Sequence, residues 1–148
     1  MEAIRVGLIL VVAAIVGGAF LVFVWSQEQL PLNVVNGIGV SATTKRAQIL
    51  SPKGWIPAIE TRVTIHNLTS DDALWVGYEY TYYLNNEFWD GGSGTYASGV
   101  VIPAGTTKNL KYSIECTGIQ GHVTIEGIVT VVVSGENIEV PYSNEIIL

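Results

Sequence analysis

The stretch that decides the fold is residues 121–148, GHVTIEGIVTVVVSGENIEVPYSNEIIL. Every second position over 123–133 is apolar or glycine, and the alternation resumes over 138–142. Successive side chains of a strand point to opposite faces, so the pattern predicts two strands that each turn one face toward a core. Gly135, between the two runs, can adopt the positive φ that a tight hairpin requires. Pro141 cannot donate to a ladder, which places the last strand at a sheet edge.

The same period of two recurs upstream, in ETRVTIHN (60–67), LWVGYEYTYYL (74–84) and NLKYSIECT (109–117). In the second of these we expect one face to carry Leu74, Val76, Tyr78, Tyr80, Tyr82 and Leu84, with Trp75 on the other. Turn signals fall in HNLTSDD, LNNEFWDGGSG and IPAGTT. Residues 33–148 are therefore predicted to form an all-β, antiparallel, Ig-like or fibronectin-like β-sandwich of about seven strands.

The amino-terminal part has a different composition. Residues 6–25, VGLILVVAAIVGGAFLVFVW, contain no charged side chain, and about 20 helical residues span the roughly 30 Å hydrocarbon core of a bilayer. We predict a transmembrane helix over 6–26, a cytoplasmic amino terminus over 1–5 and a short spacer over 27–32. A cleaved signal is the alternative, but bulky Phe23 and Trp25 stand where a signal peptidase needs small residues.

Orientation and pairing of this helix follow from a few residues. Arg5 is the only basic residue before it, which favours a single-pass protein with an extracytoplasmic carboxyl-terminal domain. Small residues spaced four apart allow close helix approach, so a homo-oligomer could form through the face with Ala13/Gly17 and Ala14/Gly18. Membrane lipids are the expected partners of the anchor.

Composition excludes some partners. The chain has 7 Lys and Arg against 13 Asp and Glu, for a net charge of -6. No basic run exceeds Lys45-Arg46, so a phosphate-binding surface for nucleic acid is not expected. The lone Cys116 cannot form a disulfide within the chain, and its place on an apolar row predicts a buried, inert thiol.

Catalytic and metal-binding patterns are weak. The only histidines, His66 and His122, have no obvious partner in the sequence, so we expect surface histidines, no enzyme activity and no cofactor. Clustered oxygens suit calcium, but Asn85, Glu87 and Asp90 match no fixed metal-binding loop, and no metal is expected. Asn67-Leu68-Thr69 forms a sequon on a predicted turn, which makes Asn67 a candidate glycosylation site.

Aromatic residues give the strongest indication of a binding site. Tyr78, Tyr80 and Tyr82 share one face, and Phe88-Trp89 are predicted to lie at the following turn. Such tyrosines usually pack a core while their hydroxyls reach its rim. The alternative is an amphipathic groove between the sheets that accepts an acyl chain or a hydrophobic segment, with Phe88 and Trp89 at its mouth. These five residues are the candidate ligand-binding residues.

The order of motifs adds a resemblance to a known family. The segments VTIHN, YEYTYYLNN, GGSG, SGVVIPAGTTKNLKYSI and VTIEGIVTVVVSGENIEVPYSNEI together resemble the late embryogenesis abundant type 2 (LEA type 2) family, whose unit is the water stress and hypersensitive response (WHy) domain. The similarity extends from about Leu32 to the end. It departs at Asn67-Leu68, where the family usually has Asn-Pro. The resemblance implies a β-sandwich with a role in desiccation or stress tolerance and, in some anchored relatives, lipid binding or transfer.

Two functions follow as expectations. The first is a non-catalytic, membrane-anchored envelope protein that gives stress protection by binding lipid, another hydrophobic ligand or protein. The second is a structural envelope, filament or adhesion subunit that docks through a sandwich surface or edge. The strand over 138–142 could accept edge pairing, although Glu139 and Pro141 would limit the ladder.

Overall fold

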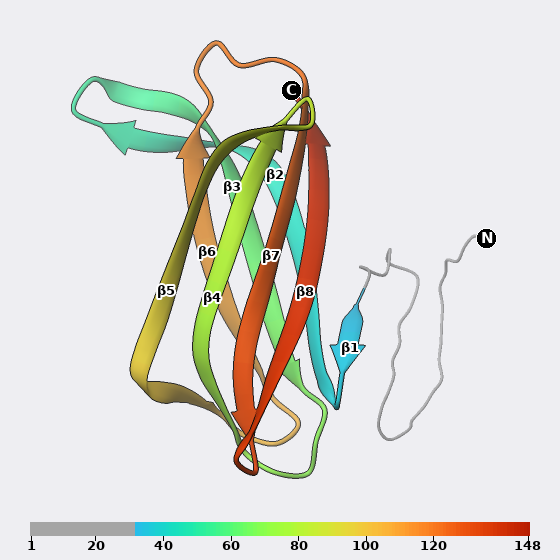
Figure 1. Ribbon diagram of the computed structural model, residues 1–148. Coiled ribbons are helices and arrows are strands. Elements are labelled where there is room, and N and C mark those ends of the chain that lie inside the picture. Colours follow the sequence, from blue (N-terminus) through green and yellow to red (C-terminus); the bar gives the residue numbers. More distant parts are fainter. Residues whose placement is uncertain (1–31) are drawn as a thin grey trace, which may run out of the picture. The chain divides into compact units, whose positions relative to one another are not determined.

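The computed structural model describes residues 32–148, which form a compact unit of eight strands in two antiparallel sheets (Figure 1). The strands are β1 (Asn33–Val35), β2 (Ile38–Ser51), β3 (Gly54–Asn67), β4 (Ala73–Leu84), β5 (Glu87–Ile102), β6 (Thr107–Glu115), β7 (His122–Val133) and β8 (Glu136–Ile147). One sheet has the order β1-β2-β3-β6 and the other β5-β4-β7-β8. The predicted antiparallel β-sandwich is confirmed, with eight strands where about seven were expected.

Several predictions concern residues that the structure does not describe. The cytoplasmic segment 1–5, the transmembrane helix 6–26, its Ala13/Gly17 and Ala14/Gly18 pairs and most of the spacer lie outside the described residues. Within residues 32–148, no helix is long and apolar enough to cross a membrane.

Three strand pairs are joined by two-residue turns in which both residues have positive φ: Asn36-Gly37, Asn85-Asn86 and Ser134-Gly135. This conformation matches the twist of the flanking strands and favours Asn and Gly. The tight hairpin expected at Gly135 is confirmed, with the turn at Ser134-Gly135. The turn expected within LNNEFWDGGSG lies at Asn85-Asn86, but its Gly-rich part, GGSG, is not a turn, because residues 91–94 lie inside β5.

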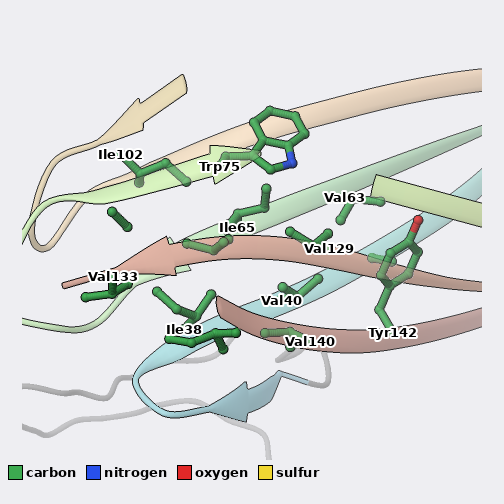
Figure 2. Packing of buried hydrophobic residues seen from close by; sticks show 14 residues of the cluster. Ile38, Val40, Val63, Ile65, Trp75, Ile102, Val129, Val133, Val140 and Tyr142 are labelled. Atoms are coloured by element: carbon green, nitrogen blue, oxygen red, sulfur yellow. The ribbon is translucent and has the colours of Figure 1, made fainter. Parts of the chain in front are cut away.

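The core lies between the sheets and is built from the predicted inward rows. In Figure 2, Val129 and Val133 of β7 and Val140 of β8 point toward Ile38 and Ile65 of the opposite sheet. All these side chains are buried. The alternation over 121–148 therefore predicted both strands and the face that each one buries.

A β-bulge at Val76 changes which residues of β4 point inward. The pairing of β4 with both β5 and β7 shifts between Trp75 and Gly77, so Val76 is an extra residue in this strand. Trp75 points inward, with 4% of its surface exposed, whereas Leu74 is 37% exposed. The expectation that Leu74 and Val76 share the tyrosine face, with Trp75 opposite, was wrong, because one inserted residue reverses the alternation.

Side-chain hydrogen bonds join the sheets along the edge where β2 and β8 meet. Asn33 Nδ2 donates to the Pro141 carbonyl at 2.6 Å, and Arg46 Nη2 donates to the Ile147 carbonyl at 3.2 Å. Pro141 does lie in a terminal strand of its sheet, as predicted. The segment 138–142 therefore lies close to β1, so it is less open to edge pairing than its sequence suggested.

Asn67 connects three segments at the end of β3. Its side chain is fully buried, and Nδ2 donates to the carbonyls of Asp71 and Ile102, both at 2.8 Å. Oδ1 accepts hydrogen bonds from the Thr69 backbone N–H at 3.0 Å and from its hydroxyl at 2.7 Å. The Asn-Leu-Thr tripeptide therefore forms an Asx turn. This geometry argues against a glycan on Asn67, since one would displace bonds from a buried nitrogen.

We predict that Asn67→Ala lowers the free energy of unfolding by about 3 kcal/mol, because it leaves several buried polar groups without partners. Chemical denaturation of residues 32–148 measures the change. Asn109→Ala is the matched control, since Asn109 bonds Thr64 at an exposed position, and it should change stability by less than about 0.5 kcal/mol. Equal effects of the two substitutions would contradict the role given to Asn67.

Candidate functional site

Five tyrosines form a layer between the sheets, which we call the tyrosine layer: Tyr78, Tyr80, Tyr82, Tyr112 and Tyr142. The ring of Tyr80 from β4 stacks on Tyr112 from β6, with centroids 3.9 Å apart and planes at 11°. Tyr82 meets Tyr112 edge to face at 6.0 Å. The hydroxyls of Tyr112 and Tyr142 lie 2.9 Å apart and share a hydrogen bond. The rings therefore fill the space between the sheets with one another.

Glycines make room for this layer. Tyr80 is paired with Gly92 on one side and Gly127 on the other, and Gly127 is paired with Tyr142, so Gly and Tyr alternate across four strands. A Cβ on Gly92 would lie 2.6 Å from the Tyr80 hydroxyl oxygen, closer than real Cβ contacts allow, and one on Gly127 would overlap the Tyr142 ring. Gly92 and Gly94, which the sequence placed in a turn signal, instead accommodate the rings of Tyr80 and Tyr78.

Burial determines the chemistry of these hydroxyls. It raises the pKa of Tyr82 and of Tyr112 far above the usual value for tyrosine, and it raises the pKa of Tyr142 to about 12. Ionisation is disfavoured because a phenolate is poorly solvated between the sheets. At neutral pH these groups are hydrogen-bonding phenols, which does not suit them to act as nucleophiles or bases.

The structure brings together part of the predicted ligand-binding set. Tyr78, Tyr80 and Tyr82 lie on the inner face as predicted, and Trp89 packs edge-on against Tyr82 at 6.0 Å. Phe88 is 71% exposed. Phe88 and Trp89 both belong to β5, just after the turn. The core-packing interpretation accounts for the tyrosine contacts, and ligand binding by the five residues stays a prediction.

The four most exposed large apolar side chains of residues 32–148 lie at one end of the sandwich, which we call the apolar end. Figure 1 shows the β2–β3 turn, the β4–β5 turn and the end of β8 at this end. Its large exposed residues are Leu50 at 69%, Trp55 at 66%, Phe88 at 71% and Ile147 at 65% exposure. Of these, only Phe88 was predicted from the sequence. Leu50 and Trp55 were missed because their exposure depends on where a neighbouring strand ends.

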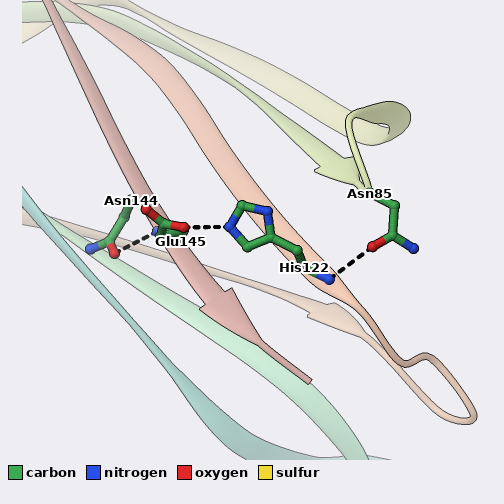
Figure 3. Close-up of polar contacts among 4 residues, drawn as sticks. All are labelled: Asn85, His122, Asn144 and Glu145. Carbon is green, nitrogen blue, oxygen red and sulfur yellow. Dashed lines mark hydrogen bonds and ion pairs between the residues drawn. The ribbon is translucent and has the colours of Figure 1, made fainter.

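The two histidines differ in their surroundings. Nε2 of His122 contacts a carboxylate oxygen of Glu145 on β8, and its backbone N–H donates to Asn85 Oδ1 at 3.0 Å (Figure 3). This partner was not apparent from the sequence, because only the pairing of β7 with β8 brings Glu145 to His122. The side chains of His122 and Glu145 are 39% and 68% exposed, so the pair contributes little to stability. His66 is partly buried, and desolvation lowers its pKa.

Cys116 and the acidic residues show no reactive arrangement. Cys116 is buried beside Ile59 and Tyr82, as predicted, and burial raises the pKa of its thiol. A raised pKa lowers the thiolate fraction and therefore the reactivity. Within residues 32–148, no group of three or more His, Cys, Asp or Glu side chains could hold a metal ion.

Comparison with known proteins shows the fold alone. No protein-family model matches the chain, and no curated protein matches it significantly. A structural genomics target solved by X-ray crystallography is 19% identical, with a TM-score of 0.59 over 76% of this chain and 88% of its own. The putative ApaA protein from Bordetella pertussis is 18% identical, with a TM-score of 0.54 over 82% of this chain and 96% of its own. At such identities only the sandwich architecture is shared.

We predict that Gly127→Ala lowers stability by about 2 kcal/mol, because the added methyl group forces the Tyr142 ring to move. Thermal or denaturant unfolding measures the loss. In a Tyr142→Ala background the same methyl group has free space, so the two substitutions should be strongly non-additive. Additive losses in this double-mutant cycle would show that Gly127 matters for another reason.

We also predict that the fold is lost at alkaline pH. The folded-state pKa of Tyr142, about 12, lies above its ordinary value of 10.0, so the stabilisation is complete below pH 10 and declines as pH rises toward 12. The expected loss at the upper limit is about 3 kcal/mol. Part of the tyrosinate absorbance should therefore appear together with the loss of circular dichroism. Complete tyrosine ionisation near pH 10 in a folded domain would contradict this prediction.

Proposed function

We propose that the protein is a non-catalytic, membrane-anchored envelope protein whose β-sandwich binds hydrophobic surfaces, either lipid or partly unfolded protein. The observation that carries the proposal is the contrast between the interior and the apolar end. Inside the sandwich, the ring of Tyr80 stacks on Tyr112, and the hydroxyl of Tyr112 is hydrogen-bonded to that of Tyr142, so these side chains contact one another. At the apolar end, Trp55 and Phe88 expose 66% and 71% of their surfaces to solvent.

Large apolar side chains grouped on a monomer surface are typical of sites that bind a protein or a membrane. A ligand between the sheets would have to separate the stacked rings of Tyr80 and Tyr112, whereas the apolar end needs no rearrangement. Binding by the predicted tyrosine groove is therefore less favoured than binding at the end that contains Phe88.

The cellular context of the proposal comes from the sequence. The apolar segment 6–25 supports a membrane anchor with the sandwich outside the cytoplasm. The motif order that resembles the LEA type 2 and WHy families supports a role in stress or desiccation protection. We also infer an Ig-like or fibronectin-like arrangement, supported by the crossing of the chain between sheets after β3, β5 and β6.

A structural envelope, filament or adhesion subunit is the second candidate, and the edge of β5 favours it. This strand is terminal in its sheet. Residues 91–95 and 100–102 contain no charged residue and no proline, two of the features by which natural edge strands avoid pairing, and they pair regularly with β4 on either side of an irregularity at residues 96–99. This candidate requires the full-length protein to be oligomeric after detergent solubilisation.

We predict that Phe88→Ser weakens binding to hydrophobic surfaces about tenfold, the effect of losing one large apolar contact. Sedimentation of residues 32–148 with phosphatidylcholine vesicles, and protection of a heat-unfolded protein from aggregation, measure the binding. Val101→Ser is the matched control, because Val101 is 49% exposed at the other end of β5, and it should bind normally. Failure of the unmodified domain to bind either surface would refute the proposed function.

A further inference from the structure

The β2–β3 hairpin extends beyond the sheet that contains it. Residues 48–51 pair with 54–57, and β6 pairs with β3 only from Ala58 onward. Four residue pairs therefore form a two-stranded ribbon, which Figure 1 shows projecting from the sandwich. We call residues 48–57 the ribbon. At about 3.4 Å per residue it projects roughly 13 Å.

The ribbon is apolar on both faces. Leu50 is paired with Trp55, so their side chains share one face, and the two are 69% and 66% exposed. On the other face Ile49 is paired with Ile56. An isolated two-stranded ribbon is marginally stable in water, and exposed apolar pairs of this kind are stabilised when something covers them.

Charge separates this region from the remainder of the domain. Residues 41–59 contain Lys45, Arg46 and Lys53 and no acidic residue. Elsewhere in residues 32–148 there are three Lys or Arg and eleven Asp or Glu. Lys53 lies in the turn at the tip, and the ribbon of roughly 13 Å that separates it from the sheet is longer than the Debye length of about 8 Å at physiological salt. An anionic surface can therefore approach the tip without strong repulsion from the body.

From these observations we propose that the ribbon is the docking element of the domain and that its occupant is an anionic lipid surface. This inference rests on the proposed function and names its lipid class. Trp55 and Leu50 enter the interface between headgroups and acyl chains, where an aromatic ring is favoured. Lys53 faces lipid phosphates, while Lys45, which is paired with Glu60, and Arg46, which is hydrogen-bonded to Ile147, remain at the base.

The chain outside the described residues supports this occupant over a soluble partner. The predicted anchor ends at residue 26 and β1 begins at Asn33. The intervening spacer reaches at most roughly 20 Å. Asn33 pairs with Val40, which is eleven residues, or roughly 36 Å of strand, from the end of the ribbon at Ser51. The ribbon therefore reaches the membrane that holds the anchor when the strands are inclined toward the bilayer plane.

The test uses residues 32–148, which form a compact unit with their own core. Sedimentation is compared for phosphatidylcholine vesicles and for vesicles that also contain phosphatidylglycerol. Each Lys near an anionic surface strengthens binding about fivefold. Lys53→Gln should therefore weaken binding to the anionic vesicles about fivefold, and Trp55→Ser more than tenfold. Lys111→Gln makes the same charge change on β6 and should leave binding unchanged.

Each other outcome has a definite meaning. An equal loss in Lys53→Gln and Lys111→Gln, or normal binding by Trp55→Ser, would overturn the ribbon proposal. Equal binding to neutral and anionic vesicles that depends on Phe88 would overturn it while leaving the proposed function intact. Loss of protection of unfolded protein in Trp55→Ser, with vesicle binding unchanged, would make the ribbon a protein-docking element instead. Absence of binding to every surface would refute both proposals.

Discussion

The stacking of Tyr80 on Tyr112 across the space between the sheets is the contact on which the rest of the sandwich depends. Two buried clusters fill the interior, and Tyr112 packs against both of them. The hydroxyl of Tyr112 is also hydrogen-bonded to that of Tyr142. One residue of β6 therefore contacts a central strand, β4, and a terminal strand, β8, of the opposite sheet. Aromatic pairs of this kind add about 1 kcal/mol each beyond the area that they bury.

Much of the fold could be predicted from the sequence, because most strands keep a strict period of two. The rows of β7 and β8 were predicted correctly, since their pairing runs without a register shift. The prediction failed in β4, where a period of two cannot detect the extra residue Val76. It failed again at Gly92 and Gly94, because glycine favours turns and also permits a ring to lie over a strand. Only the position of Tyr80 on the neighbouring strand distinguishes these two roles.

The candidate site was predicted less well than the fold, for a related reason. The sequence shows that Tyr78, Tyr80 and Tyr82 share a face, but whether that face binds a ligand depends on what lies opposite. The answer comes from β6, which is distant in the sequence and places Tyr112 on Tyr80. Likewise, the exposure of Trp55 follows from the length of β6 and not from its own strand. Properties that depend on two distant segments are the ones that local patterns cannot supply.

The glycine and tyrosine positions of the tyrosine layer also constrain how the sequence can evolve. A side chain at position 92 or 127 becomes acceptable only when the ring at position 80 or 142 becomes smaller, and each such change is harmful alone. Related sequences should therefore inherit these positions as linked pairs. Correlated substitutions at these pairs would then indicate the same spacing between the two sheets, even in related sequences whose overall identity is too low to show common ancestry.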